Sequence, residues 1–309
     1  MRILITGVAG FIGSNLASRL LHDGHDVIGI DNLAYGLREN VPPGVTFHRQ
    51  DIRDRDAYPL FRGVDVVFHF AAKNCIADCQ CDPVETADIN VRGTVNVFEA
   101  ARREQVKKIV YAESSALYEG CRQYPTPECD EAPESFYAVS KMATKLFADA
   151  YHRYYGVTFT ALRYFCVYGP VQDYRRTVPP VMSAFIIKLL KGEAPIIYGT
   201  GEKRRDFVYV DDINDFHVQC LTDERTDHKV FNLGSGVNHS VNDIYSMITD
   251  LLDIHIPPVR KPDLPGEAEM TLADIAAAQG LGWVPKTSMR IGLQNAVAYI
   301  KSELDKGNI

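Results

Sequence analysis

The chain begins with MRILITGVAGFIGSNLASRLL (residues 1–21), and the fold class can be inferred from the order of elements that these residues predict. Its residues 2–6 are apolar and β-branched, as in a buried strand, and residues 11–22 have a helical pattern. Glycines in a strand–loop–helix unit permit a tight turn and close backbone approach to a pyrophosphate, which then meets the free N–H groups of the helix. We therefore expect a dinucleotide-binding loop, with cofactor contacts from Gly7, Gly10, Phe11, Ile12 and Gly13.

Strand-like and helix-like segments alternate through the first two-thirds of the chain. Short apolar runs predict strands at 27–30, 45–48, 64–70, 108–112 and 158–165, and amphipathic patterns predict helices at 84–104 and 137–155. Near-continuous apolar strands between helices are typical of a parallel sheet that is covered on both faces. The sequence thus predicts an α/β protein with a Rossmann-type, doubly wound parallel sheet and a smaller α/β substrate-binding lobe.

Two domains are expected because the pattern of the sequence changes near residue 166. Prolines recur along the chain after this point, whereas residues 206–210 and 229–233 again resemble strands. We assign residues 1–165 and about 206–233 to the cofactor-binding domain. Residues 166–205 and 234–309, approximately, form the smaller lobe.

Composition excludes several classes of protein. The 309 residues include 33 basic and 40 acidic side chains, and the net charge of −7 does not suit binding to a nucleic-acid backbone. No uncharged stretch reaches the roughly 18–20 apolar residues of a transmembrane helix. Glycines interrupt the uncharged run 3–17, which argues against a signal peptide, and seven cysteines are an odd number for a disulfide framework. We expect a cytoplasmic protein that binds neither nucleic acid nor a membrane.

Acidic residues follow two of the predicted strands at the cofactor end. Asp31 ends the second strand, where a carboxylate accepts the ribose hydroxyls and repels a 2′-phosphate, so it favours NAD over NADP. Arg38 follows closely and leaves NADP as an alternative. Asp51 and Ile52 follow the third strand and are placed to meet adenine.

A tyrosine and a lysine predict the catalytic centre. Tyr137 and Lys141 lie four residues apart on one face of a predicted helix. An ammonium beside a phenol favours the phenolate, which acts as a general base. Ser114 ends a buried strand at the sheet edge where such folds bind ligands. The alternatives are an ordinary surface pair for the first two residues and a helix cap for the serine.

These residues and further motifs resemble the extended short-chain dehydrogenase/reductase family, and within it the nucleotide-sugar 4-epimerases. The resemblance covers nearly the whole chain and includes GFIG (10–13), DNL (31–33), DI (51–52), HFAAK (69–73), NVRGT (90–94), SSALY (114–118), YAVSK (137–141), LRYFCVYGP (162–170), RDFVYVDD (205–212) and LAD (272–274).

The resemblance implies NAD-dependent 4-epimerisation of a UDP-sugar, UDP-galactose/glucose or the N-acetyl forms, through a transient 4-keto intermediate. It implies that Tyr137 is the base, Ser114 orients the sugar 4-oxygen and Lys141 holds the nicotinamide ribose. It also implies a homodimer through the helices at 84–104 and 137–155. The further NAD contacts that it implies are Asn32, Phe70, Ala71, Ala72, Lys73, Asn90 and Phe165. The substrate contacts, in addition to Ser114 and Tyr137, are Cys166, Val178, Pro179, Tyr198, Arg205 and Glu267.

Four residues depart from the family pattern and leave the identity of the sugar nucleotide open. Cys166 stands where an Asn usually touches the diphosphate, and Leu264 where an Arg usually binds it, with 260–261 as replacements. Glu113 and Glu119 replace small residues near Ser114. A UDP-glucuronate 4-epimerase, a 4-reductase, a dehydratase or decarboxylase of the same scaffold, and a non-catalytic NAD sensor remain alternatives. Ser115 and Ala116 argue against the dehydratase, because dehydratases usually carry Asp-Glu at these positions.

The cysteines at 75, 79, 81, 121 and 129 follow two of the predicted strands. Their spacing is not that of a zinc site, so we expect free thiols and no bound metal.

Overall fold

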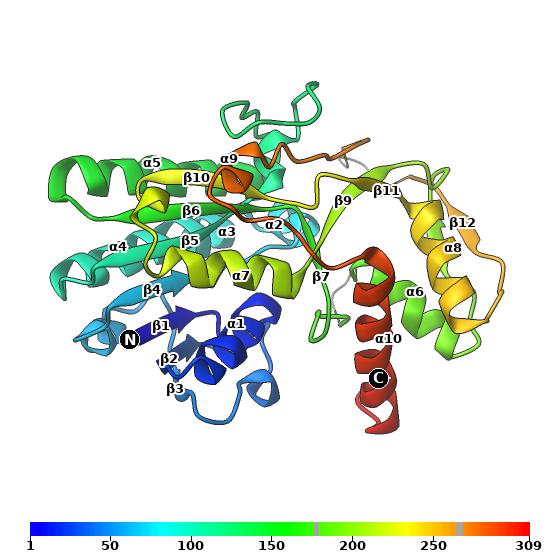
Figure 1. The fold of residues 1–309 in the computed structure, drawn as a ribbon, viewed down its shortest axis with the longest axis horizontal. Coiled ribbons are helices and arrows are strands. Elements are labelled where there is room, and N and C mark those ends of the chain that lie inside the picture. Colours follow the sequence, from blue (N-terminus) through cyan, green and yellow to red (C-terminus); the bar gives the residue numbers. More distant parts are fainter. Residues whose placement is uncertain (176–178, 264–267) are drawn as a thin grey trace. The chain divides into compact units, whose positions relative to one another are not determined.

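The computed structural model describes residues 1–175, 179–263 and 268–309. The chain divides into two compact units (Figure 1). The first comprises Met1–Cys121, Glu128–Tyr164 and Asn214–Asn232, and the second comprises Arg122–Pro127, Phe165–Ile213 and Leu233–Ile309.

A seven-stranded sheet in the order β10-β6-β5-β4-β1-β2-β3 forms the centre of the first unit. The strands are β1 (Arg2–Thr6), β2 (Asp26–Asp31), β3 (Thr46–Arg49), β4 (Val66–His69), β5 (Lys108–Ser114), β6 (Phe159–Tyr164) and β10 (Lys229–Leu233). Pairing is parallel from β3 through β2, β1, β4 and β5 to β6. Because parallel strands end at the same edge, Thr6, Asp31, His69 and Ser114 lie along one edge of the sheet. The predicted fold class is confirmed.

The helices of this unit connect successive strands. They are α1 (Phe11–His22), α2 (Ile76–Cys81), α3 (Pro83–Ala87), α4 (Gly93–Arg103), α5 (Phe136–Tyr155) and the greater part of α7 (Val210–Cys220). Short 3₁₀ turns lie at η1 (Arg38–Asn40), η2 (Arg55–Phe61), η4 (Ser115–Tyr118) and η5 (Glu224–Thr226). The single helix predicted over 84–104 is instead α3 and α4 joined by a π-helical turn, η3 (Asp88–Arg92). A π turn inserts one extra residue without ending the helix, which the periodicity of the sequence does not reveal.

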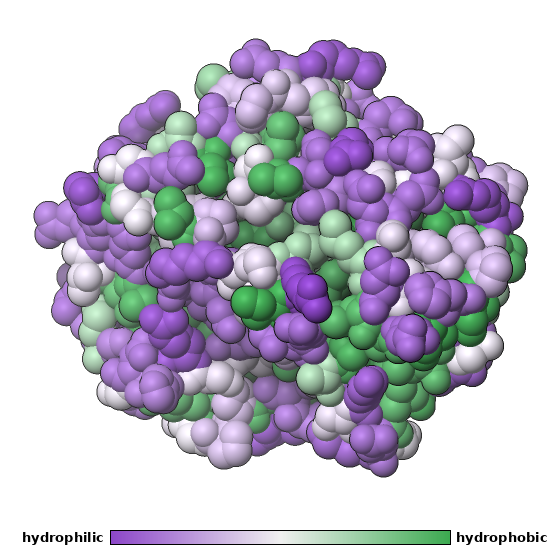
Figure 2. Space-filling model, turned by 45° about the vertical axis from the view of Figure 1, so that its right-hand side comes forward, coloured by the Kyte–Doolittle hydropathy of each residue, from purple (hydrophilic) through white to green (hydrophobic). Residues whose placement is uncertain are grey.

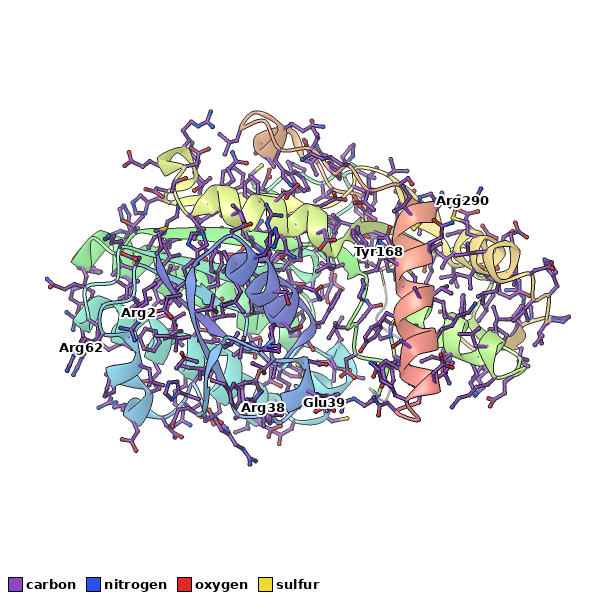
Figure 3. The ribbon with its side chains drawn as sticks, turned by 60° about the horizontal axis from the view of Figure 1, so that its bottom comes forward. Arg2, Arg38, Glu39, Arg62, Tyr168 and Arg290 are labelled. Atoms are coloured by element: carbon purple, nitrogen blue, oxygen red, sulfur yellow. The ribbon has the colours of Figure 1, made fainter. Side chains whose placement is uncertain are left out.

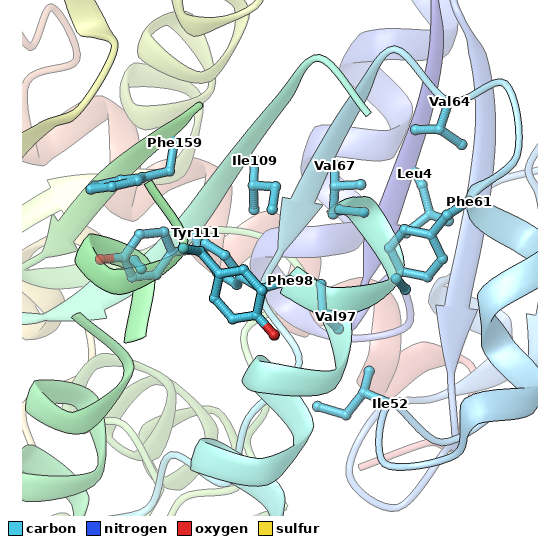
Figure 4. Packing of buried hydrophobic residues seen from close by; sticks show 14 of the residues in the cluster. Leu4, Ile52, Phe61, Val64, Val67, Val97, Phe98, Ile109, Tyr111 and Phe159 are labelled. Atoms are coloured by element: carbon cyan, nitrogen blue, oxygen red, sulfur yellow. The ribbon is translucent and has the colours of Figure 1, made fainter. Parts of the chain in front are cut away.

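Two apolar layers hold the helices against the sheet. On one face, Tyr111 of β5 packs edge-on against Phe98 of α4, which also contacts Tyr151 of α5, with ring centroids 5.6 and 5.5 Å apart (Figure 4). On the other face, Phe68 of β4 packs against His217 of α7 at 5.7 Å. Full burial of such a side chain stabilises the fold by about 1.5–3 kcal/mol. The doubly wound arrangement follows from strands that are apolar on both faces.

The second unit contains two small sheets and four helices in its described part. Its strands are β7 (Cys166–Tyr168), β8 (Ile196–Tyr198), β9 (Arg204–Tyr209), β11 (Asn238–Ser240) and β12 (Val259–Lys261), in the orders β11-β9-β7 and β12-β8. The helices are α6 (Val181–Leu190), α8 (Val241–Leu252), α9 (Ala276–Gln279) and α10 (Met289–Asp305). Tyr168 (Figure 3) packs onto Gly292 of α10, where an added Cβ would lie 2.2 Å from the tyrosine hydroxyl. Only glycine permits this approach.

The chain returns to the first unit later than the sequence predicts. We expected the return at about residue 206, but β9 is parallel to β7 and antiparallel to β11, so it belongs to the small sheet. The return comes at Asn214, inside α7. β10 does join the large sheet, beside β6, as expected for 229–233.

Among the described residues, no helix combines the length and apolar character needed to span a bilayer. Figure 2 shows hydrophilic and hydrophobic side chains interspersed over the face in view.

Candidate functional site

The loop between β1 and α1 and the start of α1 form a glycine cradle in which Gly7 and Gly13 leave no room for a side chain. Gly7 has φ +77° and its N–H donates to the carbonyl of Ile30, and the N–H of Gly10 donates to the carbonyl of Gly7. A Cβ on Gly13 would lie 2.2 Å from the Gly7 carbonyl oxygen, and one on Gly7 would lie 2.8 Å from the Ala71 nitrogen. No side chain caps α1, and its first turn contains no acidic residue. An uncapped helix N-terminus beside a glycine loop fits a pyrophosphate, so this part of the chain suits NAD.

Asp31 is attached to this loop through its carboxylate. Oδ2 accepts a hydrogen bond of 3.0 Å from the N–H of Ala9, and Oδ1 accepts one of 2.8 Å from the N–H of Leu33. Burial raises the pKa of Asp31, while these two backbone donors lower it in part. Each oxygen keeps a further lone pair, which is what binding of ribose hydroxyls requires. The guanidinium of Arg38 lies over the ring of Phe47, 4.6 Å from its centroid.

Asp51 has a partner that the sequence did not reveal. Arg53 binds both of its carboxylate oxygens, at 2.9 and 2.7 Å, and Asn32 donates to Oδ2 at 2.9 Å. The hydrogen bonds from Arg53 hold the pKa of Asp51 well below its usual range. Ile52 is buried against Gly93, where a Cβ would come within 2.6 Å of its side chain. The segment at 51–53 is therefore fixed against the start of α4.

Asn90 joins the segment after β4 to α5. Its Oδ1 accepts from the N–H of Lys73 at 2.8 Å, and its Nδ2 donates to the carbonyl of Lys73 and to Ser140 Oγ, both at 2.9 Å. Ser140 Oγ in turn donates to the carbonyl of Tyr137. Asn90 lies in the π turn and is 1 % exposed, so the extra residue of this turn coincides with a buried bridge.

The segment 70–73 is held at the edge of the sheet. The N–H groups of Phe70 and Ala71 donate to the backbone and the hydroxyl of Thr6, respectively. Lys73 is 4 % exposed and forms an ion pair of 2.5 Å with Glu85. Burial lowers the pKa of Lys73, but Glu85 outweighs this and raises it above its ordinary value.

The predicted catalytic residues lie at the end of β5 and the start of α5. Tyr137 and Lys141 are 8 % and 6 % exposed. Lys141 Nζ donates to the carbonyl of Ala112 at 2.9 Å and lies 5.9 Å from the centroid of the Tyr137 ring. Ala112 is two residues before Ser114, whose Oγ accepts from the N–H of Ala116 at 3.1 Å. The three candidates thus belong to one corner of the first unit.

Lys141 titrates in an unusual range. Burial lowers its pKa from 10.5 to about 8, and the negative charge of Glu113 opposes this only in part. A buried ammonium beside a phenol ring favours the phenolate, because the two opposite charges attract strongly where water is excluded. Such a pair can act as a proton acceptor whose strength depends on the charge of the lysine.

Glu113 does not face the same side as Ser114. Successive residues of a strand point to opposite faces, and the Glu113 carboxylate is buried in an ion pair of 2.6 Å with Arg163 and accepts from the Tyr111 hydroxyl at 2.7 Å. Arg163 also donates to Tyr118, to the carbonyl of Glu128 and to Glu131. Glu113, which departs from the family pattern beside Ser114, is therefore the internal partner of a buried arginine.

The expected substrate residues of the second unit are placed as follows. Cys166 of β7 pairs with Phe207 of β9, two residues beyond Arg205, so 166 and 205 lie on neighbouring strands. Arg205 donates to the Arg204 carbonyl at 3.0 Å. The NAD candidate Phe165 is buried, and Pro179 and Tyr198 are partly buried, with Tyr198 ending β8 in the other small sheet. Val178, Leu264 and Glu267 lie outside the described residues.

The sequence left the role of Arg260 open and did not reveal the buried contacts of Asp206. Arg260 donates to the Thr200 carbonyl at 2.6 Å, and Asp206, fully buried, accepts from the backbone of Ser235, Gly236 and Ala273. In the sequence, the buried position of Asp206 is indicated only by strand alternation, which places Asp206 and Arg205 on opposite faces of the strand. None of the seven cysteines, all of which lie in the described residues, forms a disulfide, and the part of the chain that the structure describes contains no group of three or more His, Cys, Asp or Glu suited to a metal.

Comparison with known proteins identifies the family. Residues 3–234 match the NAD dependent epimerase/dehydratase family. The UDP-glucose 4-epimerase of Mycolicibacterium smegmatis is 34% identical, over 98% of this chain and 99% of that protein. The crystal structure of UDP-glucose 4-epimerase from Thermotoga maritima with UDP-glucose is 34% identical, with TM-score 0.95, and covers 98% of this chain and 100% of that one. UDP-N-acetylglucosamine 4-epimerase from Methanobrevibacter ruminantium, in complex with UDP-N-acetylmuramic acid, is 30% identical, with TM-score 0.94 and 98% of both chains covered.

The chain belongs to the NAD dependent epimerase/dehydratase family. It is an NAD-dependent enzyme that modifies nucleotide sugars, and its cofactor is NAD.

We expect Gly13→Ala to lower the NAD content of the purified protein by at least about tenfold, because the new Cβ would lie 2.2 Å from the Gly7 carbonyl oxygen and displace the cradle. Bound NAD is measured by its absorbance after release. Gly280→Ala is the control, since its Cβ would make contacts of 3.4 Å, an ordinary distance. Full NAD content in Gly13→Ala would contradict the assignment of the cradle.

Proposed function

We propose that this chain is a UDP-sugar 4-epimerase, which inverts C4 of UDP-galactose/glucose or of the N-acetyl forms through a transient 4-keto sugar. The observation that carries the proposal is the position of Lys141, anchored to Ala112 and 5.9 Å from the Tyr137 ring, at the end of the strand that bears Ser114. The likeness to 4-epimerases over nearly the full chain supports it.

In this proposal, the chain's own residues remove the proton of the sugar 4-hydroxyl and later return it. Ser114 hydrogen-bonds the sugar 4-oxygen, and the Tyr137 phenolate removes the proton of the 4-hydroxyl. Lys141 keeps the phenolate accessible through its positive charge. When bound, NAD would supply the hydride acceptor for C4 and the hydride donor for the opposite face of the 4-keto sugar. Tyr137 then gives the proton back to the 4-oxygen, so the protein ends in its starting state.

The second unit supplies the nucleotide end in this proposal. The planar guanidinium of Arg205 suits two oxygens of a diphosphate, and Cys166 on the neighbouring strand contributes only a weak donor. Pro179 and Tyr198 are proposed to contact uridine, together with Val178 and Glu267. The relatives from T. maritima and M. ruminantium are described with UDP-glucose and UDP-N-acetylmuramic acid, which supports a uridine diphosphate.

The test uses the purified protein without added cofactor. Incubated separately with UDP-galactose, UDP-N-acetylglucosamine and UDP-glucuronate, it is expected to produce the C4 epimer of one of the first two, resolved by chromatography. Tyr137→Phe is expected to lower kcat by about 10²–10⁴-fold, because the proton acceptor is lost. Turnover of UDP-glucuronate alone would move the assignment to a UDP-glucuronate 4-epimerase. Absence of any epimer, even with added NAD, would refute the proposal.

The pH dependence of turnover tests the role of Lys141. Its ammonium is charged below a pKa of about 8 and neutral above it, so kcat is expected to fall as the pH rises through this value. Lys141→Arg keeps its charge above pH 12, and the fall near pH 8 should disappear even though turnover is slower overall. Lys145→Arg, on the same helix and paired with Glu131, should retain the original profile. An unchanged fall in Lys141→Arg would exclude Lys141 as its source.

We further propose that two copies associate through α5. One side of this helix exposes Val139, Leu146, Phe147 and Tyr154, whose exposed fractions are 49%, 62%, 42% and 76%. Their spacing places them along one face of the helix, and a contiguous apolar face of this kind marks an interaction surface.

Leu146→Glu is expected to convert the dimer to a monomer in sedimentation velocity, because it places a charge in the apolar contact. Ile291→Glu, at an exposed apolar position of α10, should leave the dimer intact. A monomeric unsubstituted protein, or a dimer that survives Leu146→Glu, would exclude this interface.

A further inference from the structure

The first turn of α5 is held by a side chain from outside the helix. The carboxylate of Glu119 accepts hydrogen bonds from the N–H of Ser135 at 2.7 Å, from the N–H of Glu134 at 3.1 Å and from the Ser135 hydroxyl at 2.9 Å. Ser135 is itself the N-cap of α5, and its Oγ accepts from the N–H of Ala138 at 3.1 Å. A negative charge at this end also interacts favourably with the helix dipole. One carboxylate therefore holds the two residues that directly precede α5.

Glu119 also belongs to the structure that carries Ser114. It directly follows the 3₁₀ turn η4, whose N-cap is Ser114, and its N–H donates to the carbonyl of Ala116 at 3.2 Å. The strand end, the short turn and Glu119 thus form one continuous support. On the other side, Tyr137 is the second residue of α5, two positions after Ser135. Glu119 therefore connects the turn that follows Ser114 with the residues that precede Tyr137.

Other hydrogen bonds near Glu119 hold the backbone of the loop that connects η4 with α5. The N–H of Ala132 donates to the carbonyl of Leu117, and the N–H of Gly120 donates to the carbonyl of Ala132. Gln80 accepts from the N–H of Phe136 at 3.2 Å. None of these three contacts reaches Ser135, whose N–H and hydroxyl both bind the Glu119 carboxylate.

We propose that Glu119 is a positioning residue that sets the distance between the Ser114 hydroxyl and the Tyr137 phenol. This inference rests on the proposed function, since it concerns the two groups that bind and deprotonate the sugar 4-hydroxyl. Catalytic groups lose up to about 100-fold in rate when they are displaced by about 1 Å. Without an acceptor at position 119, the substrate still binds through its nucleotide, but the serine and the tyrosine no longer meet the same oxygen.

A purely structural cap would behave differently. Loss of a cap lowers the melting temperature and leaves turnover per folded molecule unchanged, whereas loss of positioning lowers kcat with little change in KM. The readout that separates the two is therefore the division of the effect between kcat and KM.

The experiment compares Glu119→Met with Glu119→Gln in the full chain, using the UDP-sugar that the unsubstituted protein epimerises. The two side chains are similar in size, but only glutamine keeps an acceptor oxygen for the Ser135 N–H. We expect Glu119→Met to lower kcat by about 10–100-fold with KM within about threefold, and Glu119→Gln to recover kcat to within about threefold of the original. Ser288→Ala, which removes the cap of α10, should lower the melting temperature without changing kcat.

Each outcome has a separate meaning. Unchanged kcat in Glu119→Met, or equally slow Met and Gln variants, would overturn the inference while leaving the proposed function intact. An unsubstituted protein without epimerase activity would instead overturn the proposed function. If Glu119→Met does not fold, as judged by circular dichroism, Ser135→Ala replaces it, because it removes one of the three donors. Lower kcat at constant KM in that variant supports the inference, and original kcat overturns it.

Discussion

Arg163 carries a positive charge at a position that no water reaches, and much of the first unit is organised around that fact. An unpaired charge in a protein interior costs several kcal/mol, so its partners must be fixed. They come from β5 through Glu113, from η4 through Tyr118, and from the segment before α5 through Glu131. Glu131 also pairs with Lys145 of α5. The strand that ends in Ser114 and the helix that begins near Tyr137 are therefore joined through one guanidinium.

The parallel sheet supplies the second level of order. Its strands end at one edge, so residues far apart in the chain meet there: the glycine loop after β1, Asp31 at the end of β2, the segment at 70–73 after β4 and Ser114 at the end of β5. Buried polar contacts then fix each strand end. His69, whose pKa burial lowers to about 3, hydrogen-bonds Thr6 on one side and Thr94 on the other. A neutral imidazole of this kind connects two strands and a helix without introducing a charge.

The sequence predicts features that depend on neighbouring residues. The glycine loop, the alternation of strands and helices and the Tyr137–Lys141 face are local patterns, and all of them are present in the structure. Features that depend on distant partners were missed. Glu113 and Arg163 are 50 residues apart, and nothing in either neighbourhood indicates that they meet. β9 has an ordinary strand pattern, but the sheet that it joins depends on pairing with β7 and β11, which lie elsewhere in the chain. The π turn at Asn90 is likewise set by the contacts of one buried side chain.

The chain passes between the two units five times, at residues 121–122, 127–128, 164–165, 213–214 and 232–233. On the ribosome, this interleaving delays the completion of the first unit. Strand β6 remains an open edge of the large sheet until β10, at residues 229–233, has emerged to cover it. By then, β7 and β9 of the sheet β11-β9-β7 have been synthesised, although β11 is still to come. The nascent chain therefore carries an unpaired strand edge through about 65 residues of synthesis, a period in which an edge-binding chaperone would protect it.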